Sequence, residues 1–115
     1  MTAITIKRFD KPDQEEKSEK RLSRTVNTLA GPVALSTIEP GWIWSEHVKP
    51  AAGTDLCELS HHGYVVSGRL GVSMRDSNEL VFGPGDILEI PAGHDARVVG
   101  NEPVVIIDWS AIANR

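Results

Sequence analysis

The side chains of this chain best suited to chemistry near neutral pH include one cysteine, four histidines and one tyrosine. Cys57 and His61 stand four positions apart, and His94 follows the turn Pro91-Ala92-Gly93. A cysteine thiolate and a histidine imidazole are both metal ligands, and together they favour Zn²⁺ or another borderline-soft ion over Mg²⁺ or Ca²⁺. Tyr64 adds a hydroxyl that is able to donate a hydrogen bond into a cavity. Any chemistry is therefore expected to depend on a metal ion or on histidine and tyrosine side chains.

Each of these residues also has a purely structural interpretation. A free cysteine such as Cys57 is usually a small buried hydrophobe, and His61 would serve equally well as a hydrogen-bonded wall residue. His94 lies in a turn, where its imidazole would satisfy backbone groups of the loop. His62 follows His61 in a strand-like region, so its side chain is expected on the opposite, exposed face. The residue types alone leave both interpretations open.

Several classes of function find no support in the sequence. There is no glycine-rich phosphate loop of the Walker type, no GxGxxG before a helix and no GxSxG nucleophile turn. The net charge of −4 speaks against nucleic acid or an anionic membrane surface as the main partner. The longest uncharged run, residues 25–38, has 14 residues, fewer than the roughly 20 apolar residues of a membrane-spanning helix. We therefore expect a partner that is neither nucleic acid nor membrane.

Length and cysteine content bear on organisation and compartment. The 115 residues predict a single domain over 1–115 with one core. No continuous apolar segment resembling a secretory signal stands at the start. One cysteine cannot form an internal disulfide, and an unpaired thiol fits a reducing compartment. The expected location is the cytoplasm.

The elements that must position the candidate residues are short and β-rich. Runs of apolar or β-branched residues alternate with turns rich in glycine and proline, which is typical of an antiparallel sandwich or barrel. The predicted strands are 33–38, 42–48, 64–67, 70–74, 80–82, 87–90, 96–99 and 103–109. In the second of these, Trp42 and Trp44 have strand spacing and are expected to share a face. No stretch of ten or more residues shows helical periodicity with caps, so we predict an all-β fold.

The segment before these strands differs in composition. Ten of the fifteen residues from Asp10 to Arg24 are charged, and Leu22 is the only strong hydrophobe among them. Because such a segment has almost nothing to bury, we expect an irregular or short helical, solvated connection there. The chain is accordingly divided into an N-terminal strand plus charged connection over 1–24 and a β-barrel over 25–115.

Two of the segments together resemble the cupin superfamily. Gly85-Asp-Ile-Leu-Glu-Ile-Pro91-Ala-Gly93 reproduces the first nine positions of the second cupin motif, in which Gly, five residues, Pro, one residue, Gly and two residues precede a histidine. The spacing of the first motif recurs from Asp55 through Cys57 and His61 to Gly68, with different side chains. The chain also resembles small bacterial single-domain cupins that carry EPGWxWSEHVKP, HxGYVxSGR, and GPGD followed by IPxGHDAxVVG. The resemblance implies a double-stranded β-helix, or jelly roll, commonly a homodimer.

The same resemblance implies where a metal site would lie. The four ligand positions of metal-binding cupins correspond to Asp55, Cys57, His61 and Ala96, so this chain departs from the family pattern at every one. Ala96 cannot bind a metal, whereas the other three side chains can. A further ligand would come from His94 or from His47, and Asp95 or Asp86 would orient an imidazole.

The sequence thus supports two functional hypotheses. The first is a cupin that binds a divalent metal ion, Zn²⁺ as first choice, and a small polar organic ligand. In it the metal would polarise a carbonyl or carboxylate and His61 or His94 would move a proton, with the reaction unassigned. The second is a metal-free, non-catalytic ligand-binding or sensing module, which the loss of the family's glutamate and of the ligand at Ala96 favours.

Overall fold

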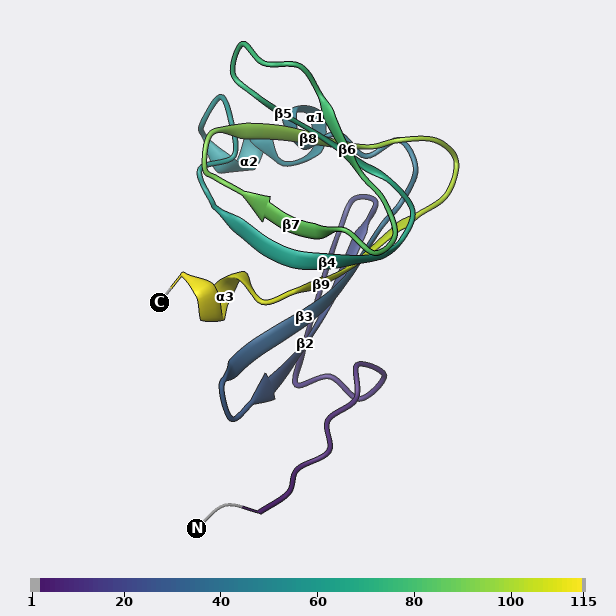
Figure 1. Ribbon diagram of the computed structural model, residues 1–115, viewed down its shortest axis with the longest axis vertical. Coiled ribbons are helices and arrows are strands. Elements are labelled where there is room, and N and C mark those ends of the chain that lie inside the picture. The colour runs from purple at the N-terminus through teal and green to yellow at the C-terminus, as the bar shows by residue number, and fades with distance from the viewer. Residues whose placement is uncertain (1–2, 115) are drawn as a thin grey trace.

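The structure, a computed structural model, describes residues 3–114 and is built from nine strands and three one-turn helices in that range (Figure 1). The strands are β1 (Gln14–Ser18), β2 (Arg21–Thr28), β3 (Gly31–Ile38), β4 (His61–Ser67), β5 (Leu70–Met74), β6 (Leu80–Phe82), β7 (Ile87–Ile90), β8 (His94–Val98) and β9 (Val104–Asp108). The helices are α1 (Trp44–His47), α2 (Lys49–Ala52) and α3 (Ser110–Ala113). The all-β prediction is confirmed.

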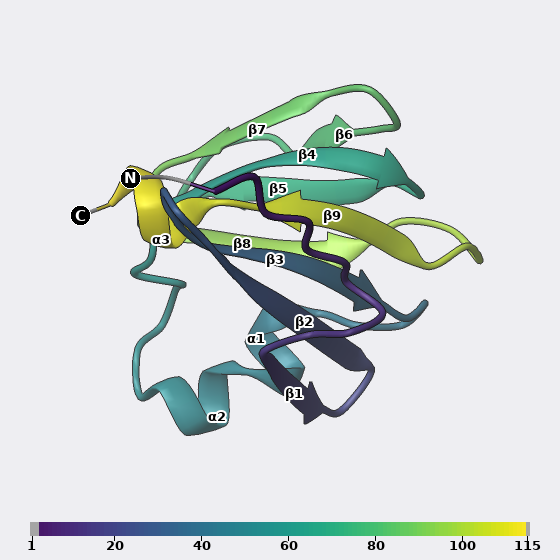
Figure 2. The same ribbon diagram turned by 90° about the horizontal axis from the view of Figure 1, so that it is seen from below.

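The strands form two antiparallel sheets. The larger has the order β1-β2-β3-β9-β4-β7, and the smaller has the order β6-β5-β8. The view from below shows β7, β4, β9 and β3 side by side in one layer, with β5 and β8 in a layer behind it (Figure 2). Short turns join β4 to β5 and β6 to β7, so consecutive strands cross from one sheet to the other. This arrangement places the inner faces of the two sheets against each other.

The core lies between these inner faces. Alternate residues of β4, Gly63 and Val65, are buried, while Tyr64 and Val66 are exposed on the other face. Val65 and Val104 are completely buried. At the turn after β4, Gly68 has a φ of +79°, and a Cβ there would collide with the carbonyl oxygen of Pro103. Only glycine meets both demands of this turn.

The charged N-terminal segment differs from the irregular or helical connection that its composition predicts. Residues 14–28 form a hairpin, in which Ser18 pairs with Arg21 and Lys20 takes a left-handed φ of 61° at the turn. Strand β2 pairs with β3 along its whole length, from Arg21 opposite Ile38 to Thr28 opposite Gly31. Strand β1 is exposed throughout, so its charges cost nothing to solvate and protect the sheet edge. The barrel strands therefore begin at Arg21.

The predicted strand 42–48 is wrong in type, because most of it is helical. Pro50 falls at the first turn of α2, where its missing N–H is not needed, and Gly53 ends that helix with a left-handed φ of 76°. Trp42 and Trp44 are nevertheless both buried at 6% exposure. They pack into the core from the α1 segment rather than from one strand face. No helix of residues 3–114 has the length and hydropathy that crossing a membrane requires.

Candidate metal centre

A short backbone bridge brings Cys57 beside His94. The Cys57 N–H donates to the carbonyl of His94 at 2.8 Å, and the Gly93 N–H donates to the carbonyl of Cys57 at 2.6 Å. Gly93 reaches this geometry with a φ of +93°, a region that favours glycine. The glycine of the 85–93 pattern thus fixes the loop of Cys57 to the first residue of β8.

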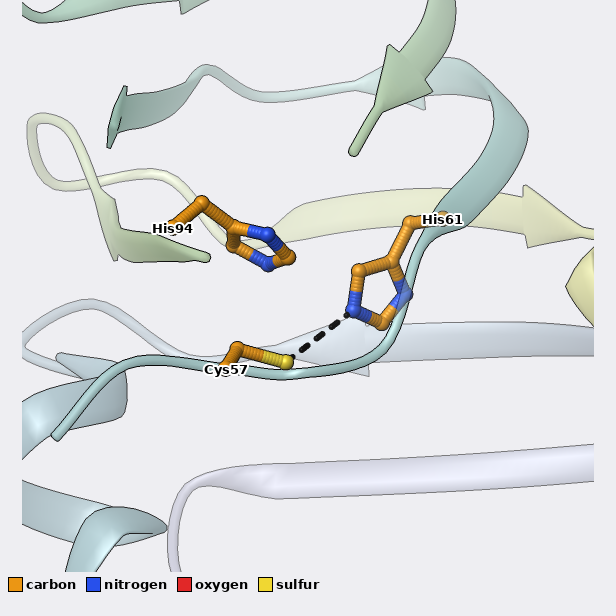
Figure 3. Close-up of side chains that lie close together, drawn as sticks. All are labelled: Cys57, His61 and His94. Atoms are coloured by element: carbon orange, nitrogen blue, oxygen red, sulfur yellow. Dashed lines mark hydrogen bonds between the residues drawn. The ribbon is translucent and has the colours of Figure 1, made fainter. Parts of the chain in front are cut away.

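His61 completes a three-residue cluster from the opposite sheet. It is the first residue of β4 and pairs with Ile90 of β7. Its Nε2 lies 3.5 Å from Cys57 Sγ, and its ring meets the His94 ring edge-on at a centroid distance of 5.0 Å. One donor atom each of Cys57, His61 and His94 lies within 4.8 Å of the other two. Figure 3 shows the three side chains converging on one point.

The second nitrogen of each imidazole has its own partner. His94 Nδ1 lies 2.8 Å from the carbonyl of Pro91, so it must carry the proton, and Nε2 is left as the free lone pair. His61 Nδ1 faces Asp108 Oδ2 at 4.0 Å. The other oxygen of Asp108 accepts a 2.7 Å hydrogen bond from the Ser110 backbone N–H. Such partners orient imidazoles in metal sites.

Burial favours the neutral forms of Cys57 and His94. Burial raises the pKa of the Cys57 thiol, because a thiolate is poorly solvated there. Burial also lowers the pKa of His94, with a smaller contribution from the neighbouring His61. Burial by itself would raise the pKa of Asp108, but the His61 imidazole and the hydrogen bonds from Ser110 outweigh it and hold that pKa below its usual value. Asp108 is therefore expected to carry a negative charge.

The cluster opens onto a cavity of about 180 Å³ between the two sheets. Its wall is mostly apolar, and two tryptophans contribute to it. The lining residues are Arg21, Ser36, Ile38, Trp42, Trp44, Val48, Cys57, Leu59, His61, Leu70, Leu88, Ile90, His94, Ile106 and Asp108. For comparison, a cavity of about 150 Å³ holds a benzene molecule. The space is therefore suited to a small organic ligand.

Two of the residues predicted for the site lie outside the cluster. The Asp55 carboxylate is largely exposed and forms an ion pair with Lys49 at 3.4 Å. Tyr64 follows the alternation of β4 onto the outer face, opposite Ile107 and Ile87, and does not line the cavity. Of the sequence-derived set, the structure brings together Cys57, His61 and His94. Ala96 is buried two residues beyond His94, on the same face of β8.

The other candidate groups have local partners. His47 contacts Glu19 at 3.7 Å and the backbone of Ile43, and His62 contacts Glu89 on the outer face. The two carboxylates proposed to orient an imidazole instead accept backbone hydrogen bonds: Asp95 from the N–H of Ser45 and Asp86 from the N–H of Gly83.

Sequence reasoning missed Asp108 and Arg21 at this cavity. Asp108 ends β9, where strand alternation from Val104 and Ile106 places it on the inner face. That alternation was a usable signal. Arg21 lies in the segment interpreted as a solvated connection, so no inward face was assigned to it.

Comparison with known proteins shows the fold. No family model matches the chain, and no curated protein does either. A solved structure of a protein of unknown function from Acidithiobacillus ferrooxidans matches with a TM-score of 0.61 at 20% identity, over 84% of this chain and 85% of that one. A sugar phosphate isomerase from a cupin superfamily of Silicibacter pomeroyi matches with a TM-score of 0.55 at 21% identity, over 79% of this chain and 59% of the other.

A third solved structure, KdgF from a Halomonas species, matches with a TM-score of 0.55 at 19% identity, over 82% of each chain. At such identities the likeness extends to the fold and no further. Two packed antiparallel sheets and neighbours that include cupin superfamily members together define the architecture: the chain has an all-β fold of the cupin type.

Proposed function

We propose that this chain binds a divalent metal ion, Zn²⁺ as first choice, through Cys57, His61 and His94, and a small polar organic ligand in the cavity beside it. The observation that supports this is the convergence of three metal-competent donor atoms within 4.8 Å of one another at the wall of a cavity. The reaction is not assigned, because the cupin fold serves many chemistries.

The donor spacing fits a tetrahedral ion. Bond lengths of about 2.0–2.3 Å to nitrogen and sulfur correspond to donor atoms about 3.3–3.8 Å apart. The separation of 3.5 Å between Cys57 Sγ and His61 Nε2 already falls in that range. A modest rotamer adjustment would bring His94 Nε2 to the same spacing. Three protein ligands leave one position for water or a ligand, as catalytic zinc sites require.

Each residue has a defined task in this proposal. Cys57 gives up its thiol proton on binding a metal, and His94 and His61 bind as neutral imidazoles. The Pro91 carbonyl fixes the tautomer of His94, and the Asp108 carboxylate faces His61 Nδ1 at 4.0 Å and favours a proton on that nitrogen. When bound, the ion would supply Lewis-acid polarisation of a ligand oxygen. The apolar wall excludes water from the ligand, and the Asp108 carboxylate would orient the His61 imidazole from the side of Nδ1.

A second candidate is a metal-free ligand-binding or sensing module. It is favoured by the same burial that raises the pKa of Cys57 and lowers that of His94, because a neutral thiol beside a neutral imidazole is stable without a cation. In that case Trp42 and Trp44 would provide the main contact surface for the ligand. The homodimer and the cytoplasmic location expected from the sequence stay predictions.

The test is metal content, measured by elemental mass spectrometry on protein prepared without a histidine tag or chelator. We expect close to one metal ion per chain, lost in Cys57→Ala/His61→Ala and retained in the matched control Asp55→Asn. Reconstitution with Co²⁺ should add a thiolate-to-metal absorption band that the double variant lacks. Absence of bound metal after exposure to Zn²⁺, Fe²⁺, Ni²⁺ and Mn²⁺ would reject the metal site and leave the ligand-binding module.

A further inference from the structure

Arg21 is a cation at the cavity wall without a side-chain partner among residues 3–114. It lies on the inner face of β2, opposite Ile38, and its side chain lines the cavity together with Cys57 and His61. Among residues 3–114, no carboxylate forms an ion pair with Arg21 and no side-chain hydrogen bond engages it. Arg24, three residues along the same strand, does have such a partner, because Glu15 lies 3.5 Å from its Nε.

The Arg21 guanidinium lines the cavity, and among residues 3–114 no side chain accepts a hydrogen bond from it. The planar guanidinium presents its donors in a fixed fork that matches the two oxygens of a carboxylate. Arg21 is therefore equipped to bind an anion that enters the cavity.

The other charged group at the cavity wall, Asp108, forms no ion pair with Arg21. The Asp108 carboxylate is already engaged by the Ser110 N–H at 2.7 Å and faces His61. The positive charge of Arg21 acts on Cys57 as well, where it opposes part of the pKa increase caused by burial. The guanidinium and the three-residue cluster thus belong to one cavity, with apolar side chains such as Ile38 and Leu88 lining the rest.

We propose that the natural ligand of this cavity is a small organic carboxylate whose carboxylate group binds to Arg21 while the remainder of the molecule extends toward Cys57, His61 and His94. The inference rests on the proposed function in one respect, that the cavity holds a small ligand. The volume of about 180 Å³ suits a ligand about the size of benzene, which binds in a cavity of about 150 Å³.

The test compares butanoate with butanamide, which have the same number of heavy atoms and nearly the same shape but differ in charge. Binding is measured on metal-free protein by quenching of tryptophan fluorescence and by the NMR shift of the Arg21 side-chain Nε–H resonance. We expect butanoate to bind about tenfold or more tightly than butanamide, since hydrogen bonds to charged groups are the stronger ones. Only butanoate should move the Arg21 resonance.

Variants locate the effect at this side chain. Arg21→Gln should weaken butanoate binding about tenfold or more and leave butanamide binding unchanged, and Arg21→Lys should give an intermediate value. Arg24→Gln, on the outer face of the same strand, is the matched control and should bind butanoate like the parent. Equal binding of the two probes by the parent, or full butanoate binding by a folded Arg21→Gln, would overturn the proposal. If Arg21→Gln does not fold, the probe pair and the NMR shift on the parent still decide.

Metal uptake is measured separately, by exposing metal-free parent protein to Zn²⁺, and it separates this proposal from the proposed function. A preference for butanoate that depends on Arg21 in protein that binds no metal would reject the metal site and support the anion site. One metal per chain without any preference for butanoate would do the reverse.

Discussion

The two faces of β4 carry adjacent histidines with different environments. His61 points inward, where its Nε2 lies 3.5 Å from Cys57 and its Nδ1 faces Asp108. His62 points outward and contacts the exposed carboxylate of Glu89. The same contrast continues along the strand, from buried Val65 to exposed Val66. A side chain on this strand thus acquires a possible function from the face that it occupies, not from its type.

The largest difference between the faces should appear in metal binding. We expect His61→Ala to lower metal affinity by about 100-fold or more, because one of three protein ligands is removed. His62→Ala should leave affinity unchanged, since its imidazole lies on the other side of the sheet. Competition with a chromophoric chelator measures both. Equal losses in the two variants would show that the inner cluster is not the binding site.

The free energy of unfolding should show the same contrast between the inner and outer faces of β4 at Val65 and Val66. Val65 is fully buried, and Val65→Ala is expected to cost about 2–3 kcal/mol through lost burial and the cavity that remains. Val66 is 45% exposed, so Val66→Ala should cost less than about 0.5 kcal/mol. Urea denaturation of metal-free protein gives both values. A small cost for Val65→Ala would mean that the two sheets repack around the missing methyl groups.

Several strands could be predicted from the sequence because their runs of apolar residues are bounded by residues that favour turns. The bounds 70–74, 80–82 and 87–90 match β5, β6 and β7, each ended by glycine, proline or Asx residues that stop a strand for a local reason. The segments 10–24 and 42–48 failed for a common reason. Their conformation is set by tertiary contacts: β2 is a strand because β3 pairs with it, and Trp44 is buried from a helix that packs on β8.

The site was predictable only in part, for a similar reason. Cys57 and His61 are close in sequence, and His94 follows a recognisable glycine, so these three could be proposed together. Asp55 stands two residues from Cys57 but lies in an irregular loop, where spacing does not determine direction. Arg21 is far from all of them in sequence. It reaches the cavity because β1 and β2 form a hairpin, which the charged composition of residues 10–24 did not indicate.

A variant of Asp108 tests whether a residue beyond the three donor atoms contributes to metal affinity. Asp108→Asn keeps the shape and the Ser110 hydrogen bond but removes the negative charge opposite His61 Nδ1. Loss of such an orienting partner is expected to weaken metal binding about 10- to 100-fold. The chelator competition used for His61 measures it, with Asp86→Asn as the control, because Asp86 holds a turn remote from the cluster. An unchanged affinity would show that Asp108 does not orient His61.

The same variant should change the pH dependence of stability. The pKa of Asp108 in the folded protein is lower than its usual value, so the carboxylate stabilises the fold above the pKa of the unfolded chain, about 4. That stabilisation is lost as the pH falls through the lower, folded-state pKa. Between about pH 5 and about pH 2, which lie on either side of the ordinary pKa of about 4, the free energy of unfolding should therefore fall more for the metal-free parent protein than for Asp108→Asn. Parallel curves would contradict the assigned direction.

The smallest effect is expected from the outer counterpart of the His61–Asp108 contact. Glu89 is 69% exposed where it meets His62, and exposed ion pairs contribute about 0–1 kcal/mol because water screens them and side-chain entropy opposes them. Glu89→Gln should accordingly shift the urea midpoint only slightly and leave metal affinity at the parent value. The variant is the geometric match of Asp108→Asn, since each removes the carboxylate facing Nδ1 of one of two adjacent histidines. A loss of metal affinity in Glu89→Gln would show that the outer face of β4 is coupled to the cluster on its inner face, so that the two faces do not act independently.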